Sequence, residues 1–276
     1  MKQQIDYIIS QLRGFYPEEE LRELAYWVIE ETTGLTRTQI LTECKGTQII
    51  PNIEIILQKL RTQVPVQYIF GHIEWMDLDL RVTPATLIPR PETAELVTWI
   101  LQSVSKNTPM RVLDIGTGSG CIAIALKHRA PQWHVMGIDI SSEALEVARD
   151  NAQRNGVEVK WQQLDILDKN LETDDWQWDI IVSNPPYICE KEKVDMESRV
   201  LDYEPHSALF VPDNDPLLFY RRIASLKAPM LFFEINEAYG REVCEMMREM
   251  GYMNVELKHD MYGKPRMVFG TIMRQS

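Results

Sequence analysis

The sequence predicts an α/β fold with a mostly parallel sheet, an antiparallel pair of strands at its end and a small helical bundle before it. From residue 111 onward, short apolar runs alternate with helical patterns, which is typical of a parallel sheet covered by helices. Residues 255–257 and 267–272 form the last two runs, and the Gly-Lys-Pro turn between them is too short for a crossover helix. The first 65 residues instead repeat apolar side chains at helical spacing.

The N-terminal segment has the spacing of amphipathic helices. Two sets of apolar residues lie at helical intervals, namely Leu21, Leu24, Ala25, Val28 and Ile29, and then Ile53, Ile56, Leu57 and Leu60. Pro17 suits the first helical position, and three glutamates follow it, where acids favour the positive end of a helix dipole. We therefore expect residues 1–65 to form a small helical domain with its acids in solvent.

A connecting segment separates this domain from the sheet. Residues 72–82 alternate apolar and polar side chains, which predicts a β-hairpin with its turn near Asp77. Prolines stiffen the linker that follows, up to a helix carrying Ala94, Leu96, Val97, Ile100 and Leu101. We expect residues 66–90 to comprise the hairpin and linker, and residues 91–276 to form the α/β domain.

Within the α/β domain each element has a local signal. A helix begins at Cys121, directly after a glycine-rich turn, and Ser141 or Ser142 can cap the next helix, which ends near Gly156. The β-branched and apolar runs predict strands over residues 112–115, 135–138, 157–163, 180–182 and 230–235.

Composition excludes several classes of protein. The net charge of −12 argues against an affinity that rests on many phosphate contacts, so we expect no direct binding of nucleic acid. No apolar run approaches the roughly 20 residues of a membrane span, and the N-terminus lacks the apolar core of a signal peptide, so we expect no membrane and a cytoplasmic protein. The cysteines Cys44, Cys121, Cys189 and Cys244 have neither metal-ligand nor redox spacing, and no metal site is expected.

The loop after the first strand of the α/β domain is Gly116-Thr117-Gly118-Ser119-Gly120. Glycines let the backbone turn tightly and approach a ligand closely. A dinucleotide fingerprint needs its third glycine one residue later, where this chain has Cys121, so the compact spacing disfavours a nicotinamide cofactor. A glycine turn without a ligand is the alternative.

A second loop, Asn184-Pro185-Pro186-Tyr187, follows the strand of residues 180–182. The prolines end the strand, because neither can donate to a ladder. The Asn184 side-chain carbonyl and the Pro185 backbone carbonyl can each accept one N–H of a planar NH2 group, and Tyr187 offers a face for stacking. A proline turn without a ligand is the alternative here.

Both loops resemble motifs of S-adenosylmethionine-dependent methyltransferases, the first their motif I and the second motif IV of the enzymes that methylate amide or exocyclic nitrogens. Asp139 ends the second strand, where a carboxylate can accept the ribose hydroxyls, or merely precede a helix. By resemblance to motif III, Asp165 would meet the adenine amino group and Ile166 would lie on its ring, unless Asp165 caps a helix.

The match extends to one family. Over residues 65–270 the chain resembles the bacterial release factor glutamine methyltransferases in five segments: Pro65-Val66-Gln67-Tyr68, the run from Leu87 to Thr93, residues 112–121, residues 184–188 and Gly263-Lys264-Pro265-Arg266. The resemblance implies a Rossmann-like class I methyltransferase sheet in residues 91–276 and recognition of the partner by the N-terminal domain. It also implies methyl transfer from S-adenosylmethionine, leaving S-adenosylhomocysteine, to the N5 of the glutamine in the Gly-Gly-Gln motif of peptide chain release factors.

The resemblance also assigns the site residues. Asn184, Pro185 and Tyr187 would be catalytic, and together with Pro186 they would bind the substrate; Asn184 would also touch the cofactor, with the glycine loop, Asp139, Asp165 and Ile166. Three alternatives stay open: a ribosomal-protein glutamine methyltransferase, a DNA adenine or cytosine amino-methyltransferase, and a cofactor-binding scaffold without activity. The linker Pro-Arg-Pro-Glu-Thr differs from the Pro-Arg-Ser-Pro of the ribosomal-protein family and so favours release factors.

Overall fold

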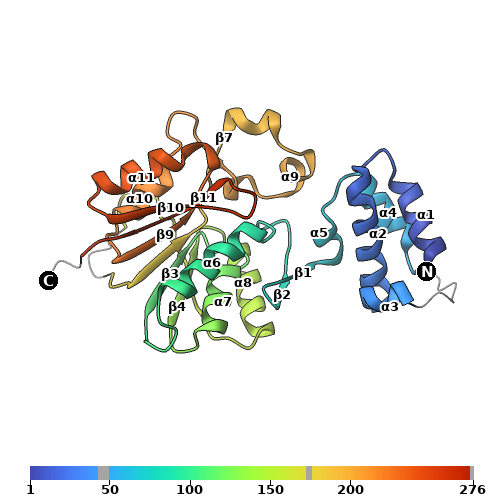
Figure 1. Ribbon diagram of the computed structural model, residues 1–276, viewed down its shortest axis with the longest axis horizontal. Coiled ribbons are helices and arrows are strands. Elements are labelled where there is room, and N and C mark those ends of the chain that lie inside the picture. Colours follow the sequence, from blue (N-terminus) through green and yellow to red (C-terminus); the bar gives the residue numbers. More distant parts are fainter. Residues whose placement is uncertain (43–49, 172–175, 274–276) are drawn as a thin grey trace. The chain divides into compact units, whose positions relative to one another are not determined.

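A computed structural model describes residues 1–42, 50–171 and 176–273 of the chain, so Cys44 lies outside the described residues. The chain divides into two compact units (Figure 1). The first contains Met1–Gly71 together with Ser198–Tyr203, and the second contains His72–Glu197 and Glu204–Ser276. Each unit is described separately.

The first unit is helical, as the apolar spacing predicts. Its helices are α1 (Lys2–Leu12), α2 (Glu18–Thr33), α3 (Arg37–Thr42), α4 (Ile53–Arg61), α5 (Val66–Phe70) and α9 (Ser198–Tyr203). Helix α2 begins at Glu18, one residue later than predicted, with Pro17 as its N-cap, and Gly34 ends the helix in the left-handed conformation with φ 69°. Ile8, Leu21, Ile29 and Leu57 fill its core with less than 2% of their surface exposed.

Two short helices of this unit, α5 and α9, are not predicted by the spacing of apolar residues in the sequence. Helix α5 falls in the segment that we expected to be a linker; Pro65 precedes its first turn, and Gly71 ends it with φ 80°. Helix α9 comes from a distant part of the chain. Its Arg199 forms a 2.8 Å ion pair with Glu20 of α2, and the Tyr203 hydroxyl donates to the carbonyl oxygen of Thr62 at 2.7 Å.

The second unit is built on a seven-stranded sheet with the order β10-β11-β9-β6-β3-β4-β5. Its strands are β3 (Arg111–Ile115), β4 (His134–Asp139), β5 (Lys160–Gln163), β6 (Ile180–Ser183), β9 (Met230–Glu234), β10 (Met253–His259) and β11 (Pro265–Thr271). All neighbouring pairs are parallel except β11 with β9 and β10 with β11, which are antiparallel. The predicted α/β fold with an antiparallel terminal hairpin is therefore confirmed.

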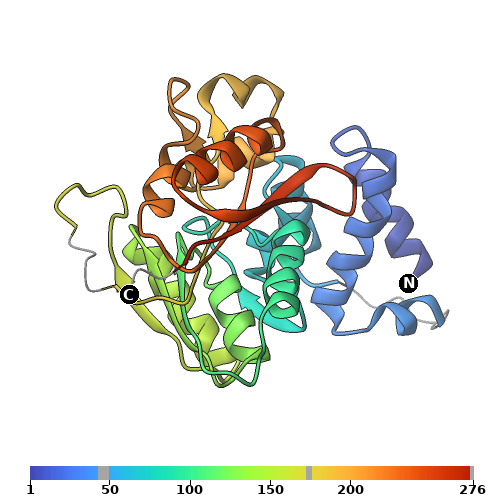
Figure 2. The ribbon, with the colours of Figure 1, turned by 60° about the vertical axis from the view of Figure 1, so that its left-hand side comes forward.

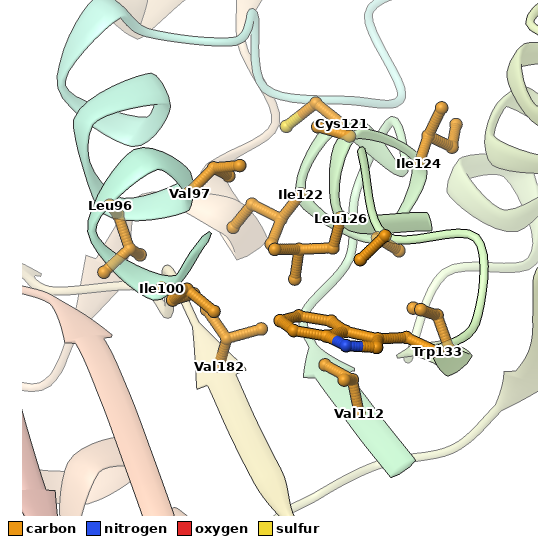
Figure 3. Packing of buried hydrophobic residues seen from close by; sticks show 14 of the residues in the cluster. Leu96, Val97, Ile100, Val112, Cys121, Ile122, Ile124, Leu126, Trp133 and Val182 are labelled. Atoms are coloured by element: carbon orange, nitrogen blue, oxygen red, sulfur yellow. The ribbon is translucent and has the colours of Figure 1, made fainter. Parts of the chain in front are cut away.

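Alternate residues of each strand point to opposite faces of the sheet. Val112, Ile180, Val182 and Phe232 belong to one core, while Leu113, Ile181, Leu231 and Phe233 belong to the other. The first face is covered by α6 (Pro91–Ser103), α7 (Cys121–Arg129) and α8 (Ser142–Arg154), and the second by α10 (Leu218–Ala224) and α11 (Gly240–Glu249) (Figure 2). In Figure 3 the buried ring of Trp133 lies between Val112 of β3 and the apolar side chains of α7.

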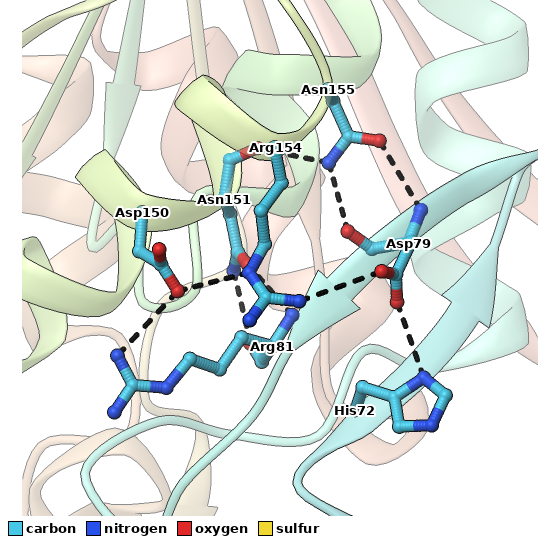
Figure 4. A network of polar contacts seen from close by, with 7 residues as sticks. All are labelled: His72, Asp79, Arg81, Asp150, Asn151, Arg154 and Asn155. Carbon is cyan, nitrogen blue, oxygen red and sulfur yellow. Dashed lines mark hydrogen bonds and ion pairs between the residues drawn. The ribbon is translucent and has the colours of Figure 1, made fainter. Parts of the chain in front are cut away.

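The predicted hairpin consists of β1 (His72–Trp75) and β2 (Leu78–Arg81). Met76 and Asp77 form its turn with φ of 51° and 63°, the left-handed pair typical of a two-residue hairpin. The fully buried Asn151 of α8 pairs with the backbone of Arg81, donating to its carbonyl oxygen at 2.9 Å and accepting from its N–H at 2.6 Å (Figure 4). The hairpin is thus fixed to the helix that follows Asp139.

Strand β5 starts three residues later than predicted, at Lys160 rather than residue 157. The N–H of Val157 donates to the carbonyl oxygen of Ala152 at 3.0 Å and closes the end of α8, so it cannot join the ladder. Short elements without a sequence signal complete the unit: β7 (Ile188–Cys189), β8 (Phe210–Val211), η1 (Glu190–Asp195), η2 (His206–Ala208) and η3 (Glu237–Tyr239). In the described parts of the chain, every helix is too short or too polar to span a membrane.

Candidate functional site

A cavity of about 290 Å³ opens at the carboxyl ends of β3, β4 and β6. The strand order reverses between β3 and β6, because the chain runs from β3 outward to β5 and then returns to the other side of β3. Ligands bind at such a reversal in open α/β sheets. Of the residues predicted for the site, all but Gly120 and Tyr187 line this cavity: Gly116, Thr117, Gly118, Ser119, Asp139, Asp165, Ile166, Asn184, Pro185 and Pro186.

The glycine loop connects β3 to α7 along one wall of the cavity. The N–H groups of Gly116 and Thr117 donate to the carbonyl oxygen of Ile138 at 2.9 and 3.0 Å, which draws the loop over the end of β4. Gly118 has φ 55°, and its N–H donates to the Asp139 carboxylate at 2.8 Å. The loop therefore presents backbone, without bulky side chains, to whatever occupies the cavity.

Gly120 has a different task from the other loop glycines. It is the N-cap of α7 with φ 81°, and a Cβ there would lie 2.9 Å from the Trp161 ring and 3.1 Å from Ala148. Its lack of a side chain thus allows α7 to start close to β5 and α8.

Asp114, which the sequence analysis did not single out, supports this loop from below. It is fully buried in β3, and its Oδ2 accepts hydrogen bonds from the Thr117 hydroxyl at 2.6 Å and the Ala123 N–H at 3.2 Å. Its Oδ1 has no partner among the described residues. Burial raises the pKa of Asp114 from its ordinary value of 3.8 to about 7, although these two hydrogen bonds lower it.

We expect Asp114→Asn to flatten the dependence of stability on pH. A raised pKa means that the folded state holds a proton which the unfolded state releases, so this contribution to stability is present below about pH 4 and is lost as pH rises through 7. The neutral amide avoids the loss, of which the part between pH 5 and 7 is on the order of 3 kcal/mol. Urea unfolding of the ligand-free protein between pH 5 and 8.5 measures the difference, and equal slopes for variant and parent protein would contradict it.

Asp139 lies at the end of β4 with both carboxylate oxygens oriented by backbone. Oδ2 accepts from Gly118 N–H at 2.8 Å and Oδ1 accepts from Ser141 N–H at 2.9 Å. Burial raises the pKa of Asp139 while these hydrogen bonds lower it. Each oxygen keeps a further lone pair, so the carboxylate can still accept two hydroxyl groups from a ligand in the cavity.

Asp165 and Ile166 line the cavity beyond β5. Ile166 is buried and supplies an apolar surface, whereas the exposed Asp165 accepts the Leu167 N–H at 2.8 Å through Oδ1. Asp165 therefore shapes its own turn and leaves one carboxylate oxygen for a ligand.

The Asn184-Pro185-Pro186-Tyr187 loop follows β6 and faces the glycine loop. The Ser183 hydroxyl donates to the carbonyl oxygen of Ile115 at 2.7 Å and so joins the ends of β6 and β3. Asn184 Nδ2 donates to the Thr93 hydroxyl at 3.3 Å. Among the described residues, no group donates to Asn184 Oδ1 or to the Pro185 carbonyl oxygen, and both residues line the cavity. The loop thus offers two acceptor oxygens to a ligand.

Tyr187 is turned into the protein, away from the cavity wall. Its ring packs on the core of the second sheet face, its hydroxyl donates to Glu234 at 3.3 Å, and its carbonyl oxygen accepts from Asn236 at 3.1 Å. Thr93 and Glu234, which the sequence analysis did not assign to the site, are therefore in direct contact with two residues of this loop.

Comparisons with known proteins identify the family. The model of the methyltransferase small domain matches residues 96–203. The release factor glutamine methyltransferase of Bacteroides thetaiotaomicron is 42% identical over 95% of this chain and 96% of its own length. That of Flavobacterium psychrophilum is 40% identical over 94% of this chain and 95% of its own length.

Among solved structures, the hMettl16 catalytic domain in complex with the MAT2A 3'UTR hairpin 6 has a TM-score of 0.56 at 15% identity, covering 80% of this chain and 82% of that one. At this identity the likeness concerns the fold, which is that of class I methyltransferases. With a sheet of this order, a glycine loop and an Asn-Pro-Pro-Tyr loop at its switch point, and relatives that match along nearly their whole length, the chain belongs to the release factor glutamine methyltransferase family.

Proposed function

We propose that this protein transfers a methyl group from S-adenosylmethionine to the side-chain amide nitrogen of a glutamine in a peptide chain release factor. The observation that carries the proposal is a pair of acceptors, Asn184 Oδ1 and the Pro185 carbonyl oxygen, which accept no hydrogen bond from the part of the chain that the structure describes and belong to residues that line the cavity. Two acceptors suit an uncharged group with two N–H donors, such as a primary amide or the exocyclic amino group of a base, and the family of the chain favours the amide of a glutamine.

The residues of the cavity fit S-adenosylmethionine, which supplies an electrophilic methyl group on a sulfonium. The glycine loop would lie along the amino acid end, and Asp139 would accept the ribose hydroxyls with its free lone pairs. Ile166 would cover the adenine ring, with Asp165 near its amino group. Asn184 would lie beside the methyl group from the other wall.

The acceptor chemistry explains why the site needs rigid acceptors. An amide nitrogen is a poor nucleophile because its lone pair is delocalised into the carbonyl. When its two N–H groups donate to Asn184 and Pro185, the nitrogen is fixed and its lone pair is directed at the methyl carbon. The N–C bond then forms as the C–S bond breaks, and one N–H proton leaves to solvent afterwards. Such positioning contributes up to about 7–11 kcal/mol to catalysis.

We also propose roles for the predicted domains. Residues 1–65 would recognise the release factor, residues 66–90 would link the domains, and residues 91–276 would hold cofactor and glutamine. Tyr187 would support the loop that binds the glutamine amide from the side away from the cavity. Its hydroxyl is hydrogen-bonded to Glu234 and its carbonyl oxygen to Asn236, which fixes its position. The enzyme would act in the cytoplasm, where release factors work, without binding nucleic acid directly.

Mass spectrometry of the Gly-Gly-Gln peptide of a purified release factor tests the proposal. Incubation with this protein and S-adenosylmethionine should add one methyl group to the glutamine, and a Gln→Glu release factor should stay unmodified. Parallel reactions with ribosomal proteins and with duplex DNA cover the alternatives. Methyl incorporation into either of these, with none in the release factor, would overturn the assignment.

A further inference from the structure

The carboxylate of Glu234 is buried and is hydrogen-bonded to the Asn184-Pro185-Pro186-Tyr187 loop. Strands β6 and β9 are parallel neighbours with Ser183 opposite Phe233, so the next residues lie side by side: Asn184 directly follows β6, and Glu234 is the last residue of β9. Glu234 is only 1% exposed, although it carries an ionisable group. Burying an acid is unfavourable unless hydrogen bonds compensate, so its partners reveal what it does.

Glu234 accepts hydrogen bonds from two hydroxyl groups, and through them it is connected to both ends of the Asn-Pro-Pro-Tyr loop. The Thr93 hydroxyl of α6 donates to Oε2 at 2.6 Å, and the Tyr187 hydroxyl donates to Oε1 at 3.3 Å. Asn184 Nδ2 in turn donates to Thr93 Oγ1 at 3.3 Å. One carboxylate therefore anchors the first and last residues of the Asn-Pro-Pro-Tyr loop.

The direction of these hydrogen bonds follows from the number of protons. A hydroxyl group has one hydrogen, and that of Thr93 is committed to the ionised Glu234, which can only accept. Thr93 Oγ1 can then only accept from Asn184, so the Asn184 NH2 must face Thr93 and its carbonyl oxygen must face away. An amide in the opposite orientation would place two lone pairs against each other.

We infer that Thr93 and Glu234 are positioning residues that set the orientation of the Asn184 amide and thereby present its oxygen, not its NH2, to the acceptor glutamine. The inference rests on the proposed function of Asn184. It gives Thr93 and Glu234 no contact with the reacting atoms, because they act through Asn184.

The charge state of Glu234 decides this orientation. Burial raises the pKa of Glu234 to about 7. Titratable or charged groups of five other segments also interact with this carboxylate: Glu92 of α6, Cys121 of α7, Tyr187 of the Asn-Pro-Pro-Tyr loop, Tyr220 of α10 and Arg266 of β11. Hydrogen bonds from Thr93 and Tyr187 and the positive charge of Arg266 lower the pKa, and Glu92 raises it. A protonated Glu234 can donate to Thr93, whose hydrogen then turns to Asn184 and favours the reversed amide.

The sign of the pH dependence follows. Above the pKa of Glu234 the carboxylate is ionised, Asn184 presents its oxygen, and kcat is at its plateau. Below it, kcat falls, because the NH2 group of Asn184 would oppose the NH2 group of the glutamine. Titration of Glu234 itself should change cofactor affinity little, since Glu234 does not line the cavity, and Thr93, which does, belongs to α6 and not to the cofactor-binding loops.

Thr93→Val and Thr93→Ser form the matched test. Valine keeps the shape and removes the hydroxyl, and we expect kcat to fall on the order of tenfold to a hundredfold with an unchanged KM for S-adenosylmethionine. Serine keeps the hydroxyl and should restore kcat to within about threefold of the parent protein. Thr98→Val on the exposed face of the same helix should leave kcat unchanged and controls for the loss of a threonine in α6.

Glu234→Gln tests the direction of the hydrogen bonds. The glutamine amide can donate to Thr93 at any pH, so we expect a lowered kcat without the fall near pH 7. A second readout needs no activity: the side-chain NH2 signal of Asn184 in the ¹⁵N NMR spectrum, assigned by its loss in Asn184→Ala, should shift with pH near 7 in the parent protein and not in Glu234→Gln.

The outcomes separate this inference from the proposed function. An inactive Asn184→Ala together with a fully active Thr93→Val of unchanged pH profile would overturn the orienting role and leave the glutamine methyltransferase assignment intact. If release factors are not methylated at all, the NMR titration still decides: a pH-independent Asn184 signal overturns the orienting role, and a shift near pH 7 that Glu234→Gln abolishes supports it.

Discussion

Asn184→Ala is expected to lower kcat for release-factor methylation by about 10²–10³-fold, the usual effect of removing one preorganised hydrogen-bonding group from an active site. The alanine removes the acceptor for one N–H of the glutamine and leaves the Pro185 carbonyl alone to hold the amide. The nitrogen can then rotate, and its lone pair spends little time in line with the methyl carbon. Single-turnover methylation at saturating cofactor measures this step directly.

Cofactor binding separates this effect from unfolding. Among the described residues the Asn184 side chain hydrogen-bonds to Thr93 alone, and the cofactor would be held mainly by the glycine loop and Asp139. Isothermal titration should therefore give a dissociation constant for S-adenosylmethionine within about threefold of the parent protein, less than 1 kcal/mol. Asn107→Ala, in an exposed loop, is the matched control and should retain full activity. Full activity of Asn184→Ala would remove the basis of the proposed mechanism.

Asp139→Ala is expected to weaken S-adenosylmethionine binding by about 10–100-fold for each ribose hydroxyl that the carboxylate binds. A hydrogen bond to a charged group contributes about 1.5–3 kcal/mol, and each 1.4 kcal/mol changes a dissociation constant tenfold. The carboxylate would accept two ribose hydroxyls, and it also holds Gly118 in the conformation that the loop needs. At saturating cofactor, kcat should fall only a few-fold, because the substitution does not change the Asn-Pro-Pro-Tyr loop that would bind the glutamine.

Glu143→Ala provides the comparison for Asp139. Glu143 is an exposed acid in the first turn of α8, bonded to Ser141 and Ser142, and it does not line the cavity. Its removal changes the net charge equally but should not alter cofactor affinity. Equal dissociation constants for Asp139→Ala and the parent protein would show that the ribose lies elsewhere.

Much of the site could be predicted because its signals are local in the chain. The glycine loop and the Asn-Pro-Pro-Tyr loop each follow a strand directly, and parallel strands bring such loops to the same edge of a sheet. Asp139 likewise lies at the end of β4 beside the glycine loop, where its carboxylate accepts the Gly118 N–H at 2.8 Å. The start of β5, in contrast, depends on a single backbone N–H group. The N–H of Val157 donates to Ala152 at the end of α8, so it is not available to the strand.

The sequence by itself determined the fold class, the two loops at strand ends and the residues that offer donors and acceptors there, because periodicity and strand-end position are properties of short segments. Only the tertiary structure decided which buried groups form hydrogen bonds with these site residues and orient them. Thr93 lies 141 residues from Glu234 in the chain, and α9 packs with helices that begin the chain. Such contacts depend on how strands pair and helices pack across the whole unit. A buried hydrogen-bond network that orients Asn184 leaves no periodic pattern in the residues that form it.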